Sequence, residues 1–182
     1  EEAHRMITPD QGQFLRMIVR STRAQTVMEL GCFTGYAAAW MADGLVDPEG
    51  RVFTCERDDQ YSRIAQTWLD QGGWTPRVTV MDSSSISLPR LIHSILDANK
   101  ASYIKHLDII LNRHLLAPHA LILADNVLFR GLVKDINMND RTRVKGPARA
   151  MDRFNKYVRN HPLLDSVILD VFDGISLIQY KQ

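Results

Sequence analysis

The chain has little of what marks several large protein classes. Its 182 residues include only two cysteines, Cys32 and Cys55, which are too few for a disulfide framework and lack the spacing of a zinc site. No apolar run approaches the ~20 residues of a membrane-spanning helix. The 22 basic and 21 acidic residues nearly cancel, so the bulk charge does not favour binding to nucleic acid. The first residues show no basic-then-apolar leader. We therefore expect a cytoplasmic protein that binds neither nucleic acid nor membrane.

Several common catalytic motifs are missing as well. The sequence has no GxGxxG fingerprint and no Walker GK[ST] loop, which weakens the case for an NAD(P)-linked oxidoreductase and for a nucleoside triphosphatase. It has no GxSxG, so a hydrolase triad is not supported. Its six histidines lack HxxxH and HxH spacing, which argues against zinc. The oxidoreductase stays an alternative, to be tested by NAD(H) binding.

Short apolar runs alternate with amphipathic stretches along the chain. Near-continuous hydrophobicity without alternation between two faces predicts buried parallel strands. Four such strands are expected, at residues 26–30, 51–55, 77–81 and 120–124. Apolar residues at helical spacing predict helices at 61–69 and 103–116, with Asp58 as a cap before the first of them.

The C-terminal part changes this rhythm. Residues 166–171 and 175–178 are two apolar runs separated by Phe172-Asp173-Gly174, which predicts an antiparallel hairpin. The polar residues 134–145 are expected to form a surface loop. The whole pattern predicts one α/β domain over residues 1–182, with a doubly wound, mostly parallel sheet and a C-terminal antiparallel hairpin.

Polar residues and glycines follow the first two predicted strands. Gly31 and Gly35 come after the first strand and allow a tight turn close to a ligand. Glu56 follows the second strand, where an acid can accept hydrogen bonds from ribose hydroxyls. The alternative is a plain turn and a solvated acid. Their occurrence after two consecutive strands favours a nucleoside site.

Oxygen ligands gather at two later strand ends. Asp97 comes three residues before Lys100, and Asp125-Asn126 follows the strand at 120–124. Two carboxylates and a carboxamide suit Mg²⁺, which prefers oxygen ligands and keeps positions open for water or substrate. Alternatively, the Asp-Asn pair starts a turn and Lys100 is solvated.

Taken together, these strings resemble the cation-dependent S-adenosylmethionine (SAM) O-methyltransferases, which include caffeoyl-CoA and catechol O-methyltransferases. The resemblance extends in order over nearly the whole chain. It is carried by residues 6–13, 29–36, 54–56, 96–103, 124–128, 153–155 and 172–175.

The resemblance implies a class I, Rossmann-like methyltransferase fold and a role for each matched position. Lys100 would be the general base. The Mg²⁺ ligands would be Asp97, Asp125 and Asn126. The residues that bind SAM would be Ile7 and Thr8 at the methionine end, Glu56 at the ribose, Ser85 and Ala98 beside the adenine, and Glu29, Gly31, Phe33 and Tyr36 along the pocket.

The implied reaction is methyl transfer to a small aromatic acceptor with two adjacent hydroxyls, and the implied assembly is a homodimer. Two departures from the family pattern stand out. Only five residues precede Met6, so the lid over the cofactor is expected to be trimmed. The stretch before Asp97 is short and leaves only residues 93–96 to form a strand. A catalytically impaired binding protein with this fold, a pseudoenzyme, is therefore the alternative.

Overall fold

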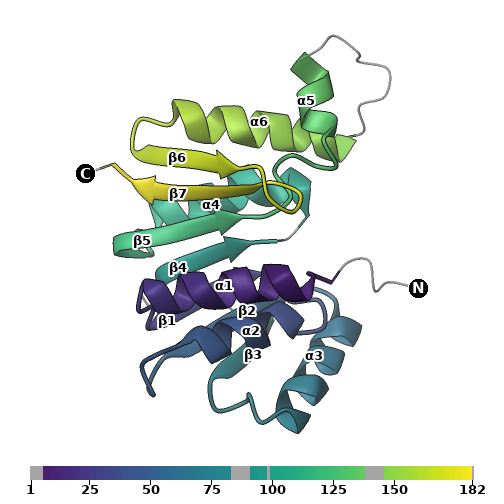
Figure 1. The fold of residues 1–182 in the computed structure, drawn as a ribbon, viewed down its shortest axis with the longest axis vertical. Coiled ribbons are helices and arrows are strands. Elements are labelled where there is room, and N and C mark those ends of the chain that lie inside the picture. Colours follow the sequence, from purple (N-terminus) through teal and green to yellow (C-terminus); the bar gives the residue numbers. More distant parts are fainter. Residues whose placement is uncertain (1–5, 83–90, 98, 138–145, 182) are drawn as a thin grey trace. The chain divides into compact units, whose positions relative to one another are not determined.

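The computed structural model describes residues 6–82, 91–97, 99–137 and 146–181. These residues form alternating helices and strands that divide into two compact units, Glu1–Ser94 and Ile95–Gln182 (Figure 1). The boundary falls within strand β4 (Leu91–Leu96). Each unit is described in turn.

The first unit contains a parallel sheet in the order β3-β2-β1. Its elements are α1 (Pro9–Ser21), β1 (Thr26–Leu30), α2 (Tyr36–Gly44), β2 (Arg51–Glu56), α3 (Asp59–Gln71) and β3 (Val78–Asp82). The register pairs Leu30 of β1 with Cys55 of β2, so these two strands end at the same edge. Buried Val27, Val52 and Val78 form part of the core.

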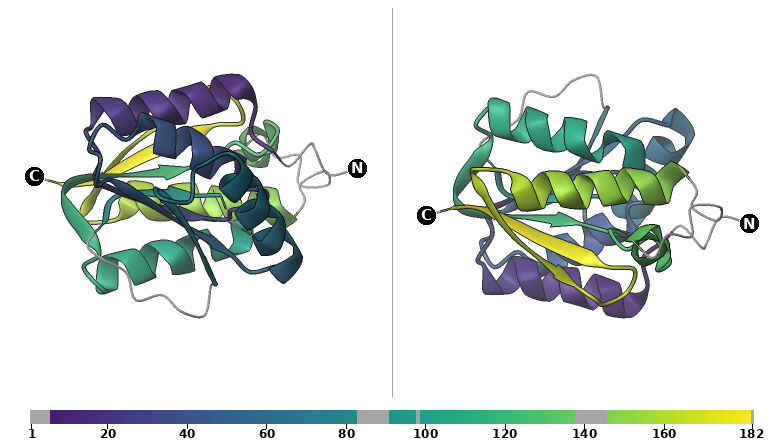
Figure 2. Two further views of the ribbon diagram at one scale, coloured as in Figure 1. Left: turned by 90° about the horizontal axis from the view of Figure 1, so that it is seen from below. Right: turned by 90° about the horizontal axis from the view of Figure 1, so that it is seen from above.

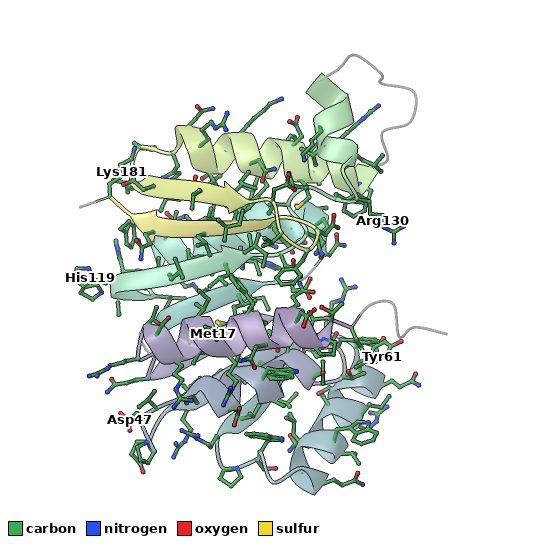
Figure 3. All side chains as sticks on the ribbon, in the orientation of Figure 1. Met17, Asp47, Tyr61, His119, Arg130 and Lys181 are labelled. Atoms are coloured by element: carbon green, nitrogen blue, oxygen red, sulfur yellow. The ribbon has the colours of Figure 1, made fainter. Side chains whose placement is uncertain are left out.

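Helices α1 and α2 pack closely against each other. A Cβ atom on Gly44 would lie 2.6 Å from the carbonyl oxygen of Arg16, so only glycine fits at this contact. The Arg16 side chain also forms an ion pair with Asp43. The outer face of α1 carries Met17, which is exposed (Figure 3). At its start, the Thr8 hydroxyl accepts a hydrogen bond from the Gln11 backbone N–H and caps the helix.

The second unit combines antiparallel strands with helices. After the end of β4 come η2 (Lys100–Ser102), α4 (Tyr103–Asn112), β5 (Leu116–Ala124), α5 (Leu132–Asn137), α6 (Gly146–Asn160), β6 (Leu164–Leu169) and β7 (Ile175–Tyr180). β7 lies between β5 and β6 and is antiparallel to both. Figure 2 shows α6 lying along the β6–β7 hairpin. The buried Phe154 of α6 packs edge-on against the Tyr103 ring of α4, with the two ring centroids 5.3 Å apart.

The predicted strands and the hairpin are confirmed, with differences at several boundaries. The helix predicted over 103–116 ends at Asn112, because His114 takes a φ of 50° and the chain turns into β5 at Leu116. The loop predicted over 134–145 begins instead with the last turn of α5, and residues 138–145 lie outside the described part. The strand expected to be only residues 93–96 is six residues long, starting at Leu91.

Candidate active site

The turn between β1 and α2 has an unusual backbone. Gly31, Phe33 and Gly35 have φ values of 108°, 51° and 82°. Two of the three are glycines, which adopt such angles without steric cost. The Gly31 and Cys32 N–H groups both donate to the Cys55 carbonyl oxygen, at 3.0 and 3.1 Å. The turn is therefore held against the end of β2.

Glu56 fixes this turn from the neighbouring strand end. Its Oε2 accepts the Phe33 backbone N–H at 2.8 Å. Its Oε1 accepts the N–H groups of Arg57 and Asp58, at 2.8 and 3.0 Å. The Phe33 ring packs on Tyr61 of α3, with centroids 4.6 Å apart (Tyr61 is labelled in Figure 3). The carboxylate thus links the two strand ends that the sequence assigned to the nucleoside.

A second carboxylate, Glu29, lies buried near the end of β1 and is 1% exposed. Its Oε2 accepts a short hydrogen bond from the Thr54 hydroxyl of β2. Burial, together with the charge of Glu29, raises the pKa of the neighbouring Cys32 thiol far above its usual value. Cys32 is therefore an unreactive core residue.

The chain start and the first turn of α2 border one cavity of about 810 Å³. Its lining includes Met6, Tyr36 and Trp40, and the Tyr36 and Trp40 rings meet edge-on at 6.2 Å. Met6 directly precedes Ile7 and Thr8 in sequence. Ile7 and Thr8, which we expect at the methionine end of the cofactor, therefore directly follow a residue that lines the same cavity as Tyr36.

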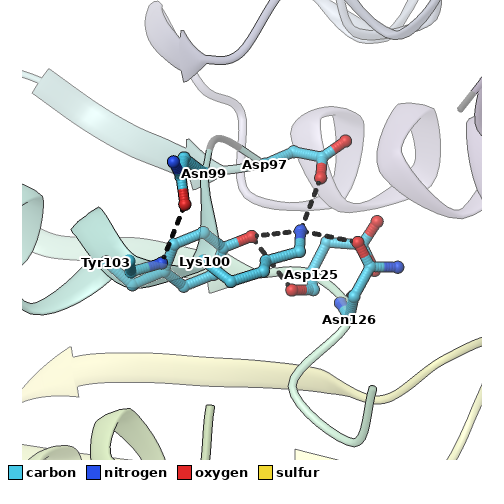
Figure 4. Close-up of polar contacts among 7 residues, drawn as sticks. Asp97, Asn99, Lys100, Tyr103, Asp125 and Asn126 are labelled. Atoms are coloured by element: carbon cyan, nitrogen blue, oxygen red, sulfur yellow. Dashed lines mark hydrogen bonds and ion pairs between the residues drawn. The ribbon is translucent and has the colours of Figure 1, made fainter. Parts of the chain in front are cut away.

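In the second unit, Lys100 is the centre of a polar cluster (Figure 4). Its ammonium donates to Asp97 Oδ1 at 3.1 Å, to Tyr103 Oη at 2.8 Å and to Asn126 Oδ1 at 2.7 Å. The Lys100 side chain is 15% exposed and that of Asp97 28%. Residues that follow β4 and β5, together with the first residue of α4, thus meet at the nitrogen of Lys100 in η2.

Tyr103, the first residue of α4, contributes its hydroxyl group to this cluster. It is fully buried, and its hydroxyl donates to the Asp125 carbonyl oxygen at 3.1 Å. Burial, with added effects from the charges of Asp97 and Asp125, raises the pKa of Tyr103 well above its usual value. The hydroxyl therefore stays protonated and remains a donor.

The turn after β5 is held by hydrogen bonds on both sides. Asp125 N–H donates to the Leu96 carbonyl oxygen at 3.0 Å, which joins the turn to the end of β4. Asp125 Oδ1 accepts the Asn126 N–H at 2.7 Å, and Asn126 has a φ of 56°. The Asn155 amide of α6 donates to the Val127 carbonyl oxygen at 2.9 Å. These contacts fix the direction of the Asn126 side chain.

The chemistry of this cluster fits a divalent cation of the Mg²⁺ type. Asp97 Oδ1 and Asn126 Oδ1 already converge on one positive charge, the Lys100 ammonium, which acts as a stand-in ion. All three candidate ligands, including Asp125, offer oxygen atoms, as Mg²⁺ requires. Across the residues that the structure describes, no group of three or more His, Cys, Asp or Glu could hold a metal, so the amide of Asn126 is needed to complete a set.

The structure therefore brings the predicted residues together in two clusters, one in each unit. Glu29, Gly31, Phe33 and Glu56 meet at the ends of β1 and β2. Asp97, Lys100, Asp125 and Asn126 meet in the second unit. Ser85 and Ala98 lie outside the described residues.

Sequence reasoning assigned no role to Tyr103 and Asn155, although both lie in strings that carry the family resemblance. The spacing of Tyr103, three residues after Lys100, was an available signal, because side chains at that separation lie on one helical face. No comparable spacing singles out Asn155, which contacts Val127, a residue far away in sequence.

The fold is that of the class I α/β methyltransferases. Residues 2–181 match the model of the O-methyltransferase family, and the chain belongs to this family. Figure 1 traces the element order that underlies this class.

Particular relatives support the same family. O-methyltransferase ankF of Aspergillus thermomutatus is 32% identical, over 100% of this chain and 81% of that protein. A catechol O-methyltransferase of Niastella koreensis is 31% identical, over 96% of this chain and 82% of that protein. The methyltransferase PaMTH1 of Podospora anserina, solved with S-adenosylhomocysteine (SAH), has a TM-score of 0.89 at 25% identity, covering 100% of this chain and 82% of its own.

Among the described residues, no helix is both long enough and apolar enough to cross a membrane.

Proposed function

We propose that this enzyme uses SAM and a divalent cation, Mg²⁺ or a similar ion, to methylate a hydroxyl of a small aromatic acceptor with two adjacent hydroxyls. The observation that carries the proposal is the convergence of Asp97 and Asn126 oxygens on Lys100 Nζ. The catechol O-methyltransferase of Niastella koreensis, at 31% identity, supports this acceptor class.

The cofactor is assigned to the first cluster. SAH in the PaMTH1 structure supports SAM as the methyl donor here. Glu56 would accept hydrogen bonds from the ribose hydroxyls, while its contacts with backbone N–H groups hold the turn in place. Glu29, Gly31, Phe33 and Tyr36 would line the pocket, with Ile7 and Thr8 at the methionine end. Ser85 and Ala98 are proposed beside the adenine from the family resemblance alone.

The acceptor chemistry is assigned to the second cluster. Asp97, Asp125 and Asn126 would hold the cation, which when bound favours the ionised form of an acceptor hydroxyl. Lys100 Nζ would receive the proton of that hydroxyl after it has first released one of its own three ammonium protons to water. The methyl group passes from sulfonium sulfur to acceptor oxygen, leaving SAH and a methyl ether. Because charge is neutralised in this step, positioning in a water-poor pocket is the main contribution of the protein.

We also propose that residues 1–182 act as one methyltransferase domain, that the chain forms a homodimer and that it works in the cytoplasm. The dimer rests on the family resemblance, and the other two points rest on the length, composition and pattern of the sequence. Size-exclusion chromatography with light scattering tests the dimer, and a monomer at micromolar concentration would contradict it.

The test is methyl transfer from SAM to catechol, followed by mass spectrometry, in Mg²⁺ buffer and again with EDTA. We expect a monomethylated product with Mg²⁺, a loss of at least a hundredfold with EDTA, and no product from phenol, which lacks the second hydroxyl. Lys100→Ala should abolish transfer, whereas the control Lys105→Ala, at an exposed position on α4, should not.

Two results would contradict the proposal. Equal turnover with EDTA would exclude the metal site. Absence of transfer across a panel of catechols, with SAH still bound, would favour the pseudoenzyme.

A further inference from the structure

The Lys100 ammonium has three protons, and three oxygens accept them. Two of these oxygens, on Asp97 and Asn126, are proposed metal ligands; the third is the Tyr103 hydroxyl (Figure 4). The lysine therefore neutralises the ligand set from within the protein.

A divalent cation and this ammonium would compete for the same two oxygens. Mg²⁺ binds its oxygen ligands at about 2.0–2.1 Å, so it would lie among the same atoms that Nζ now contacts at 2.7 and 3.1 Å. Two positive charges sharing two oxygens would repel each other strongly in a partly buried site. Sharing these two oxygens with the metal is therefore unfavourable for the ammonium.

Only one of the three lysine contacts survives such a change. The Tyr103 hydroxyl is not a metal ligand, is fully buried, and is fixed by its own hydrogen bond to the Asp125 carbonyl oxygen at 3.1 Å. It therefore offers Nζ a fixed partner beside the ligand set. The side chain is long and flexible enough to keep this contact while it leaves Asp97 and Asn126.

We propose that Lys100 serves as the internal cation of the metal-free enzyme, and that its ammonium withdraws from Asp97 and Asn126 onto Tyr103 when a divalent cation binds. The inference rests on the proposed metal-dependent function. Its consequence is an order of events: the lysine leaves the ligand oxygens only once the metal is in place. In the metal-free protein, the ammonium of Lys100 stays hydrogen-bonded to the ligand oxygens of Asp97 and Asn126.

The test measures Mn²⁺ binding alone, at one fixed pH, by the electron paramagnetic resonance signal of free Mn²⁺. Wild type is compared with Lys100→Met, which removes the ammonium, and with Lys105→Met, an exposed control on α4. We expect Lys100→Met to bind Mn²⁺ at least tenfold more tightly than wild type, and the control to differ less than twofold. Crystal structures of the wild type with and without Mn²⁺ provide the second readout.

With Mn²⁺ bound, we expect Nζ beyond 3.5 Å from Asp97 Oδ1 and Asn126 Oδ1 but still in contact with Tyr103 Oη. Tighter binding by Lys100→Met with Nζ unmoved in the Mn²⁺ structure would mean simple charge repulsion and would overturn the displacement. Equal Mn²⁺ affinity of wild type and Lys100→Met would also overturn it, while leaving the proposed function intact. Failure of both proteins to bind Mn²⁺ would overturn the metal-dependent function together with this inference.

Discussion

Replacing Glu56 with glutamine separates the two tasks of this carboxylate, holding the β1–α2 turn and binding the ribose. The carboxylate accepts N–H groups from Phe33, Arg57 and Asp58. A glutamine oxygen can keep the Arg57 and Asp58 contacts, but its NH₂ group then faces the Phe33 N–H, a donor opposite a donor. Because Glu56 is only half-buried, water offsets part of the loss, and we expect a cost of about 1–2 kcal/mol.

These costs translate into two measurable changes. For a chain of this length, about 1–2 kcal/mol lowers Tm by about 2–8 °C. A hydrogen bond to a charged acceptor contributes about 1 kcal/mol more binding free energy than one to a neutral acceptor. With two ribose hydroxyls, the variant should lose about 2 kcal/mol of binding free energy, which lowers SAH affinity about 30-fold. Differential scanning fluorimetry with and without SAH measures both effects.

Glu49→Gln is the matched control, because Glu49 is an exposed carboxylate of the same unit and its ion pair with Arg51 is long, at 3.4 Å. Its Tm should stay within about 1 °C of wild type. Wild-type SAH affinity in Glu56→Gln would refute the ribose assignment, and an equal Tm loss in both variants would refute the account of the turn.

Three further changes probe the packing and ionisation of the chain. Phe154→Ala removes a fully buried ring and should cost about 3–5 kcal/mol in chemical denaturation. Gly174→Ala should also lower the denaturation midpoint, because φ is 82° there and a Cβ would lie 2.8 Å from the Leu128 backbone nitrogen. Burial raises the pKa of the Cys32 thiol in the folded state above its usual value of 9.0, so folded protein holds this proton more tightly than unfolded protein. The resulting stability is present below pH ~9 and is lost as the pH rises further; urea titrations from pH 8 to 10 should show a steeper fall for wild type than for Cys32→Ala.

The sequence was most informative where buried strands end in polar residues. Continuous apolar runs predicted β1, β2 and β3, and their parallel pairing carries Glu29 and Glu56 to one sheet edge. The same reasoning placed Asp97 and Asn126 on separate strand ends, and both contact one lysine.

Helix and strand boundaries were predicted less well where apolar patterns are ambiguous. Leu115 and Leu116 continue the helical spacing of α4, yet the chain turns at His114 and Leu116 starts β5. Leucines suit both structures, so only the tertiary packing decides between them.

The choice of the three oxygens that Lys100 contacts could be predicted only in part from the sequence. Spacing places a lysine near an acid, but the choice among side-chain rotamers depends on Tyr103 and Asn126, which come from different elements. The role of Tyr103 as a buried anchor likewise depends on the Asp125 carbonyl, 22 residues away in sequence.

A calorimetric titration of the purified chain with SAH in Mg²⁺ buffer tests the central claim most directly. We expect saturable binding of one SAH per chain, through the turn that Glu56 holds. A folded chain that gives no binding heat at any temperature tested, and no SAH-induced rise in Tm, would contradict the assignment of a working SAM site to this protein.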